Sequence, residues 1–534
     1  MSQQSQSLPD GVDPPPEAFN FARHLLEVNA TRGNKAAYID DQATLTYGGL
    51  DERARRLAAA LAAAGVKREE RVLVLMQDTT DWPIAFLGAI FAGIVPVAVN
   101  TLLTADDYAY MLQNSRAQLV LVSGAVLPAL KAALARSEHE VQKVIVSRPV
   151  APLAFGEIEF EGWLERHAPA VHAAQTRADD PCFWLYSSGS TGRPKGAVHS
   201  HANPYWTIEL YAKRVLQLQE SDVAFSAAKL FFAYGLGNGL TFPLGVGATT
   251  LLMAERPTPE AFFKRLRGQV GGVRPTVFFC APTGYASMLA HPDLPGRGEV
   301  ALRMGSSAGE ALPADIGERF RSHFAADIVD GLGSTEMLHI FISNRPGEVR
   351  YGTTGWPVPG YVVELRAEDG QSAPDGEPGE LYIQGPSSAM MYWGNREKTR
   401  ETFQGGWTRS GDKYVHNADG TYTYAGRSDD MLKVSGIWVS PFEVEATLVQ
   451  HQAVLEAAVI GVDDGEGLVK TKAFVVLKAG GVATEAELKA FVKARLAPHK
   501  YPRFIEFIDE LPKTATGKIQ RFRLRELERA KAPA

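Results

Sequence analysis

The chain has 534 residues, a length that allows two or more domains. Its 45% hydrophobic and 22% charged residues are typical of a soluble globular protein, and they exclude collagen-like, coiled-coil and wholly disordered chains. The formal net charge of -6 provides no overall attraction to nucleic acid or to anionic membranes. Any polyanionic ligand must therefore be held by local charges.

The N-terminal residues, the longest apolar run and the two cysteines indicate the expected cellular compartment. Residues 1–17 have neither a positive start nor an apolar stretch, so we expect a flexible leader rather than a signal peptide. The longest uncharged apolar run, residues 84–99, is too short for a membrane span, and Pro96 is expected to divide it into a helix and a buried strand. Cys182 and Cys280 lie in apolar runs typical of buried strands, which favours a reduced, cytoplasmic compartment.

Short β-branched segments alternate with segments of helical spacing along the chain. We expect strands at residues 71–76, 118–122 and 141–146, and helices at 47–64 and 106–115. This alternation predicts parallel α/β layers, and the Gly- and Pro-rich stretches between them predict loops that carry ligand chemistry. A helix predicted at residues 441–450 belongs to a unit of different texture, so we place a domain boundary near Asp429.

The most informative motif runs from Tyr186 to Gly196 (YSSGSTGRPKG), directly after an apolar strand. Glycine backbone N–H groups, hydroxyls and a lysine together make a cradle for phosphate oxygens. The spacing is not that of a Walker A loop, because proline precedes the lysine and glycine follows it. The alternative is a flexible linker, which need not follow a buried strand. The predicted nucleotide-binding residues here are Ser187, Ser188, Gly189, Ser190, Thr191, Gly192 and Lys195.

Four further short motifs follow in the chain, and each has an ordinary structural alternative. Residues 331–336 (GLGSTE) also fit a helix N-cap, and residues 407–412 (WTRSGD) fit an aspartate in a β-turn. Residues 426–436 (GRSDDMLKVSG) fit a charged turn, and residues 512–519 (PKTATGKI) fit a solvated lysine in a loop. Only their order and their joint occurrence favour one function.

Together these five motifs resemble those of the adenylate-forming superfamily, which includes acyl-CoA synthetases. The resemblance implies a large multi-subdomain α/β N-terminal domain, residues 1–428, and a small mobile α+β C-terminal domain, residues 429–534. It implies that Thr335 contacts phosphate, that Glu336 helps to hold Mg²⁺ and that Lys518 is the adenylation lysine. The remaining implied residues are Gly309, Glu310, Asp330, Gly331, Leu332, Asp412 and Arg427 for the nucleotide, Asp429 for the hinge, and Lys433, Ser435, Gly436, Ile437 and Trp438 for coenzyme A.

One motif suggests a different enzyme class. Residues 305–309 (GSSAG) match the nucleophile elbow of α/β-hydrolases, with Ser307 as nucleophile and Asp330 and His339 as later partners in the chain. In the adenylate-forming pattern the same stretch lines the adenine site instead. That interpretation uses the whole chain rather than five residues.

The resemblance implies an acyl pocket beside residues 231–235, and the residues there suggest a flat, short, apolar slot. Its predicted residues are Phe232, Ala233, Tyr234, Ala308, Gly331, Gly333, His339 and Ile340, each of which also fits a place in an ordinary core. Over its whole length the sequence is similar to the benzoate–CoA ligase branch of the superfamily. This similarity implies an ATP- and Mg²⁺-dependent enzyme of aromatic-acid catabolism.

The resemblance has one departure and leaves several alternatives. An aromatic residue is usual where Leu332 stands, so apolar packing must replace adenine stacking. Coenzyme A is the expected acceptor, and an excess of 11 Lys or Arg over 5 Asp or Glu in residues 493–531 offers a place for its phosphates, or simply a solvated face. The alternatives are a ligase for a substituted benzoate or other small aryl acid, and a non-catalytic nucleotide-binding module. A monomer or homodimer without nucleic-acid or membrane partners is expected.

Overall fold

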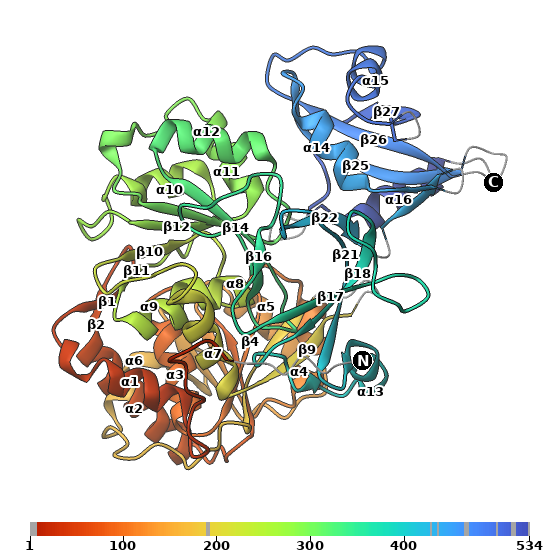
Figure 1. Ribbon diagram of the computed structural model, residues 1–534. Helices are drawn as coiled ribbons and strands as arrows, with labels where there is room; N and C mark the ends of the chain where they lie inside the picture. The colour runs from red at the N-terminus through yellow and green to blue at the C-terminus, as the bar shows by residue number, and fades with distance from the viewer. Residues whose placement is uncertain are drawn as a thin grey trace.

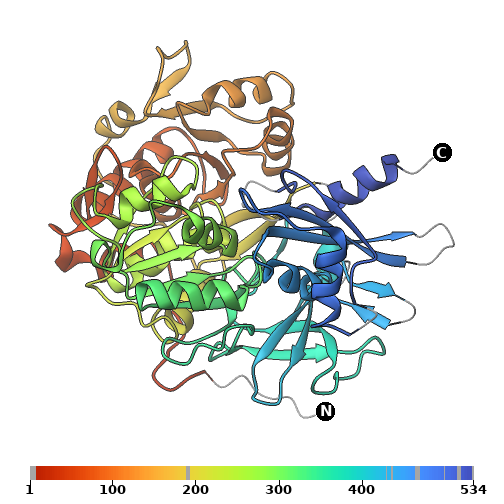
Figure 2. The same cartoon turned by 90° about the horizontal axis from the view of Figure 1, so that it is seen from above.

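The computed structural model describes residues 8–187, 193–427, 430–434, 437–463, 469–497, 500–513 and 519–531. Within them, three sheets with their helices form a large body, and the elements after residue 430 form a smaller one beside it (Figures 1 and 2). No helix in these ranges is both long and apolar enough to cross a membrane.

The first sheet is mostly parallel and has the order β19-β9-β8-β4-β3-β5-β6-β7. Its strands are β3 (Arg71–Leu75), β4 (Val95–Ala98), β5 (Leu119–Ser123), β6 (Lys143–Ser147), β7 (Glu157–Glu159), β8 (Pro181–Ser187), β9 (Lys195–Ser200) and β19 (Met391–Tyr392). The helices connecting this region are α2 (Tyr47–Ala63), α3 (Asp81–Phe91), α4 (Ala105–Ser115), α5 (Leu127–Leu134) and α6 (Phe160–Glu165). The predicted strands and helices are therefore confirmed to within two residues at each end.

The second sheet is mixed and has the order β16-β15-β14-β13-β12-β10-β11-β1-β2. Its strands are β1 (Ala36–Ile39), β2 (Thr44–Thr46), β10 (Val223–Ser226), β11 (Thr249–Leu251), β12 (Val277–Cys280), β13 (Met304–Ser307), β14 (Asp327–Gly333), β15 (Ile340–Ser343) and β16 (Trp356–Pro357). The helical segments of this part of the chain are α1 (Phe21–Val28), η1 (Ala30–Arg32), α7 (Ala202–Thr207), η2 (Ile208–Ala212), α8 (Ala233–Leu236), η3 (Gly237–Thr241), α9 (Phe242–Val246), α10 (Pro259–Leu266), α11 (Pro282–Ala290), η4 (Arg297–Glu299) and α12 (Ala314–Phe324). The η2 and η3 segments are π-helical.

The third sheet is antiparallel, whereas the sequence predicted parallel layers. It contains β17 (Val362–Arg366), β18 (Pro378–Gln384), β20 (Phe403–Gln404), β21 (Trp407–His416) and β22 (Tyr422–Arg427), with α13 (Arg396–Thr402) at its edge. The smaller body contains β23 (Leu432–Val434), β24 (Ile437–Val439), α14 (Pro441–Val449), β25 (Val454–Asp463), β26 (Val469–Leu477), α15 (Glu485–Lys493), β27 (Phe504–Phe507) and α16 (Arg521–Lys531).

The apolar run at residues 84–99 divides into a helix and a buried strand, as predicted, but the break is not at Pro96. Helix α3 ends at Phe91, and the chain turns at Gly93, whose φ of 70° suits glycine. Pro96 lies inside β4 instead of before it. Proline is tolerated there because pairing with β3 includes it while pairing with β8 begins only at Val97.

Both cysteines are buried in strands, as predicted. Cys182 lies in β8 and Cys280 in β12, and neither forms a disulfide. Burial raises the pKa of both thiols, so both stay protonated and unreactive at neutral pH.

Candidate active site

A cavity of about 700 Å³ lies where the smaller body faces the large one. The large body contributes the ends of β8 and β14 and parts of β21 and β22, and the smaller body contributes residues of α14, β25 and α16. Figure 1 shows these elements meeting near β16 and β22. The cavity therefore collects residues from all the predicted motifs that fall within the described ranges.

The segment after β14 brings Thr335 and Glu336 to the cavity wall. It connects two antiparallel strands, β14 and β15, so the alternative of a helix N-cap is wrong. The Thr335 carbonyl accepts a hydrogen bond from His199 Nε2 at 2.9 Å. Glu336 Oε1 accepts one from Ser187 Oγ at 3.2 Å and one from Tyr392 Oη at 2.6 Å. These bonds hold a carboxylate toward the predicted phosphate site.

The two ends of the predicted phosphate loop lie opposite each other on neighbouring strands. Ser187 ends β8 and pairs with Lys195, the first residue of β9. The Lys195 ammonium lies 4.7 Å from the centre of the Tyr392 ring. Burial lowers the pKa of Lys195, while nearby Glu336 raises it. The residues Ser188, Gly189, Ser190, Thr191 and Gly192 lie outside the described residues.

Asp412 and Arg427 also reach the cavity together. They are paired across β21 and β22, and Arg427 Nη1 lies 3.1 Å from Asp412 Oδ1. Since Asp412 lies within a strand, the β-turn alternative is wrong. The arrangement presents a carboxylate and a guanidinium side by side, which suits the hydroxyls of a ribose.

The predicted adenine-site residues line another part of the same wall. Gly309 has a φ of 97°, a conformation that favours glycine, and it lies with Glu310 after β13. Asp330 and Leu332 come from the neighbouring strand β14, and Leu332 is half-buried there. Burial raises the pKa of Asp330. Leu332 is therefore placed to supply the apolar contact that the sequence predicted in place of adenine stacking.

The predicted acyl-pocket residues divide into a wall and the layer behind it. Phe232, Gly331 and Gly333 line the cavity. The other five, which are Ala233, Tyr234, Ala308, His339 and Ile340, pack next to this wall and are buried or half-buried. The structure therefore brings three of the eight predicted residues to the cavity and places the other five elsewhere in the surrounding core.

His339 lies inside an aromatic cage. Its ring centre is 5.5 Å from those of Tyr211 and Tyr234 and 4.4 Å from that of Phe242. Its Nε2 donates a hydrogen bond of 3.3 Å to the Tyr234 carbonyl. Burial lowers the pKa of His339 to about 3, so the imidazole is neutral at neutral pH.

The cage predicts the effect of a single added methyl group. A Cβ at Gly237 would lie 2.3 Å from His339 Cδ2, and the ring has no free side to move toward. We expect Gly237→Ala to lower the free energy of unfolding by about 1–3 kcal/mol through overpacking. The thermal unfolding midpoint measures this. Gly33→Ala is the control, because nothing lies within 4 Å of its added Cβ; equal midpoints for the two variants would contradict the expectation.

The hydrolase interpretation is wrong. A nucleophile elbow exposes its serine between a strand and a helix, but Ser307 is the fully buried last residue of β13, and α12 begins only at Ala314. In the described part of the chain no hydrogen bond joins Ser307 to His339, whose ring lies in the aromatic cage. Asp330 is the neighbour of Ser307 across the strand pair and not part of a triad.

Sequence reasoning missed several cavity residues. Tyr392 orients Glu336 and faces Lys195, but it lies in an apolar run without a motif. Arg521 and Glu445 line the cavity from the smaller body, with Arg521 Nη2 2.7 Å from Glu445 Oε2. The position of Arg521, shortly after the last motif, was the one available signal.

The remaining predicted residues belong to the smaller body. Lys433 lies in β23 and Ile437 and Trp438 in β24, two strands that pair as an antiparallel hairpin, but their side chains are not described. Asp429, Ser435, Gly436 and Lys518 lie outside the described residues. Ile519, the first described residue after that gap, lines the cavity.

The fold and the cavity define an enzyme of the adenylate-forming class, which has a large N-terminal domain and a small C-terminal domain. The AMP-binding enzyme family matches residues 25–393, and the AMP-binding enzyme C-terminal domain matches residues 443–518. The chain belongs to this family.

Individual relatives cover nearly the whole chain. The benzoate–CoA ligase of Thauera aromatica is 56% identical over 517 residues, which is 96% of each chain. The 4-hydroxybenzoate–CoA/benzoate–CoA ligase of Rhodopseudomonas palustris is 48% identical and covers 95% of this chain and 94% of its own. A crystal structure of a benzoate CoA ligase from Burkholderia xenovorans LB400 is 61% identical with a TM-score of 0.89, covering 95% of this chain and all of its own.

Proposed function

We propose that this protein is a benzoate–CoA ligase that converts ATP, benzoate and coenzyme A to AMP, diphosphate and benzoyl-CoA through a benzoyl-adenylate. The observation that carries the proposal is the joint placement of Glu336, Lys195, Asp412 and Arg427 around one cavity whose wall includes Phe232. The full-length similarity to benzoate–CoA ligases supports the choice of acid.

The first half-reaction brings two anions together. A benzoate oxygen attacks the α-phosphate of ATP, and the bond to diphosphate breaks. Positive charge must be present where negative charge accumulates, and Lys195 supplies it in the described cavity. Lys518 is proposed to add a second positive charge, together with the backbone donors of residues 188–192. Asp412 and Arg427 are proposed to hold the ribose, and Gly309, Glu310, Asp330 and Leu332 the adenine.

A magnesium ion fits this donor set. Mg²⁺ is usually held by one or two carboxylates and by substrate phosphates, and Glu336 is a carboxylate on the cavity wall beside Ser187. We propose Glu336 as its protein ligand and Thr335 as a phosphate contact. When bound, the ion would neutralise charge on the phosphates. Ser187 and Tyr392 keep the carboxylate turned toward that position.

The second half-reaction transfers the benzoyl group to the thiol of coenzyme A. The adenylate makes the carboxyl carbon a good electrophile, because AMP is a far better leaving group than oxide. We propose that the C-terminal domain, residues 429–534, rotates about Asp429 between the two steps, and that the β23–β24 hairpin then lines the thiol channel with residues 433 and 435–438. The basic residues from Lys493 onward are proposed to hold the phosphates of coenzyme A.

A panel of acids tests the choice of substrate. We expect kcat/KM to be highest for benzoate, lower for amino-, hydroxy- and halobenzoates, and lowest for a medium-chain fatty acid, because the cavity wall at Phe232 is aromatic and short. Diphosphate release that depends on added acid measures the first half-reaction. Release without any acid would contradict the proposal, and no release with any acid would contradict it and favour a non-catalytic nucleotide-binding module.

A substituted benzoate is the second candidate substrate. The 48% identical relative carries 4-hydroxybenzoate as well as benzoate in its name. A kcat/KM for 4-hydroxybenzoate equal to or above that for benzoate in the same panel would select this alternative.

A further inference from the structure

Two buried charged residues, Asp78 and Lys229, lie at the start of the turn that carries Phe232 and have no part in the chemistry described so far. Asp78, 3% exposed, follows β3, and Lys229, 9% exposed, follows β10. Both Asp78 carboxylate oxygens lie 3.2 Å from the Leu230 backbone nitrogen, which donates to them. The Lys229 ammonium donates to the carbonyls of Met253 and Glu255, the second at 2.7 Å.

Burial of these two charges is costly. It raises the pKa of Asp78 to about 6 and lowers the pKa of Lys229, while each charge favours the ionised form of the other. Apolar residues of similar volume would fill the same space without this desolvation. An apolar side chain at position 78, however, would leave the buried Leu230 N–H without an acceptor.

Lys229 is the first residue of the turn that carries Phe232, and Asp78 binds the backbone of the next residue, Leu230. The Phe232 nitrogen donates to the Lys229 carbonyl at 3.0 Å, and a Cβ at Gly235 would lie 2.0 Å from the same oxygen. The turn from residue 229 to residue 235 is therefore tight, and its first residues are fixed by Asp78. Phe232, two residues after Leu230, lines the cavity.

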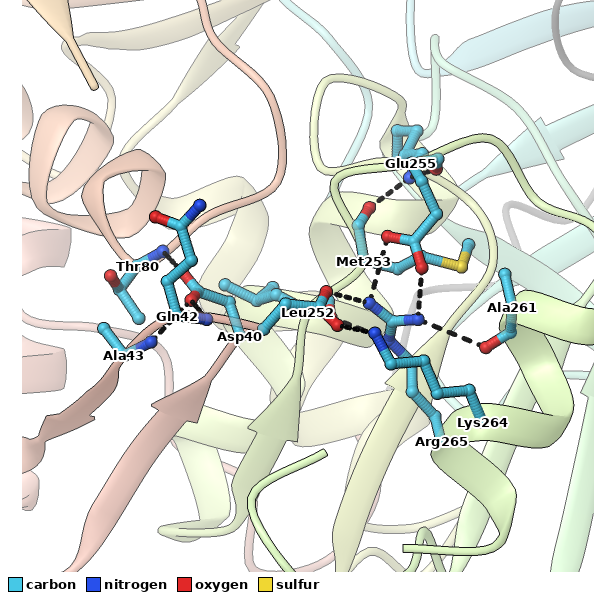
Figure 3. Close-up of polar contacts among 12 residues, drawn as sticks. Asp40, Gln42, Ala43, Thr80, Leu252, Met253, Glu255, Ala261, Lys264 and Arg265 are labelled. Carbon is cyan, nitrogen blue, oxygen red and sulfur yellow. Dashed lines mark hydrogen bonds and ion pairs between the residues drawn. The ribbon is translucent and has the colours of Figure 1, made fainter. Parts of the chain in front are cut away.

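The ammonium of Lys229 is anchored to Met253 and Glu255. Figure 3 shows the wider network to which these two residues belong, centred on Arg265. Glu255, whose carbonyl accepts from Lys229, also binds Arg265 Nη1 through its carboxylate at 2.6 Å. Arg265 is fully buried and donates to the carbonyls of Leu252 and Ala261. Lys229 thus connects the turn to the segment that follows β11, which cannot shift without breaking the bonds of Arg265.

We propose that Asp78 and Lys229 are positioning residues that set acyl selectivity by fixing the turn at residues 229–235 and hence the place of Phe232. This inference rests on the proposed function, because it assigns a role in the recognition of a small aryl acid. Neither residue contacts the substrate.

The test compares selectivity rather than activity. We expect Asp78→Ala and Lys229→Met to reduce the ratio of kcat/KM for benzoate over 4-methylbenzoate by about 10-fold, since one extra methyl group in a well-shaped pocket is discriminated by about 10- to 200-fold. KM for ATP should stay within about twofold, because hydrophobic discrimination in the acyl pocket does not involve the nucleotide. Asp78→Asn keeps one acceptor for the Leu230 N–H, so its selectivity ratio should fall less.

Asp222→Ala is the matched control. Asp222 is a 4% exposed carboxylate at the other end of β10, bonded to Arg303 at 2.6 Å, so its loss destabilises the same strand far from the turn. The selectivity ratio does not depend on how much enzyme is folded, so Asp222→Ala should leave it unchanged. If Asp78→Ala does not fold, the selectivity ratio of Lys229→Met provides the test.

Unchanged selectivity in the folded variants, or an equal loss in Asp222→Ala, would overturn the inference. Wild-type enzyme that does not prefer benzoate would instead overturn the proposed function. The two failures are therefore distinguishable.

Discussion

Replacement of Lys518 by alanine is expected to abolish benzoyl-adenylate formation and to spare thiolysis of supplied benzoyl-AMP. The α-phosphate gains negative charge as the carboxylate attacks, and a nearby ammonium stabilises that charge more in the transition state than in bound ATP. Loss of one such donor commonly slows a reaction by about 10²–10³-fold. Benzoate-dependent ATP–diphosphate exchange measures the first half-reaction, and coenzyme A consumption with benzoyl-AMP measures the second.

Lys513→Ala is the matched control for this variant. Lys513 belongs to the same basic segment, but its ammonium forms an ion pair of 2.5 Å with Glu456 and is proposed for no role in the first half-reaction. A partly exposed pair of this kind contributes up to about 1 kcal/mol, so the exchange rate should change by no more than about fivefold. Equal loss of both half-reactions in Lys518→Ala would contradict the proposed role, because the proposed domain rotation would remove this lysine before thiolysis.

Replacement of Glu336 by glutamine is expected to slow adenylation by about 10²-fold and to raise the Mg²⁺ concentration needed for half-maximal rate. Glutamine keeps an oxygen that accepts from Ser187 and Tyr392, so the local bonds survive while the charge is lost. The exchange assay over a Mg²⁺ titration measures both effects.

The variant Tyr392→Phe tests the orientation of the Glu336 carboxylate separately from its charge. It removes the 2.6 Å hydrogen bond to Glu336 but keeps the carboxylate and the ring that faces Lys195. We expect a smaller loss of rate and a nearly unchanged Mg²⁺ requirement. Glu336→Gln with the Mg²⁺ dependence of the wild type would contradict the proposal that this carboxylate holds the ion.

Sequence patterns predicted local features well and supporting contacts poorly. The alternation of β-branched and helical segments was enough for strands such as β3 and β5 and for helix α2, because each depends on its own residues. Pro96 misled the prediction, since the tolerance of proline in β4 depends on where pairing with β8 begins. The sequence did not distinguish Phe232, which lines the cavity, from His339, which lies in an aromatic cage, because both have a similar apolar sequence setting.

The sequence by itself determined the class of enzyme, because five short motifs in one order supply the groups that adenylation requires. It also predicted Glu336, Asp412 and Arg427 as site residues, and the structure brings all three to one cavity. Only the tertiary structure decided which partners hold the residues of this region. Tyr392 donates a hydrogen bond to Glu336, Arg521 forms an ion pair with Glu445, and Asp78 accepts a hydrogen bond from the Leu230 backbone. These partners lie far apart in the chain and need only a complementary charge or donor, so no local pattern marks them.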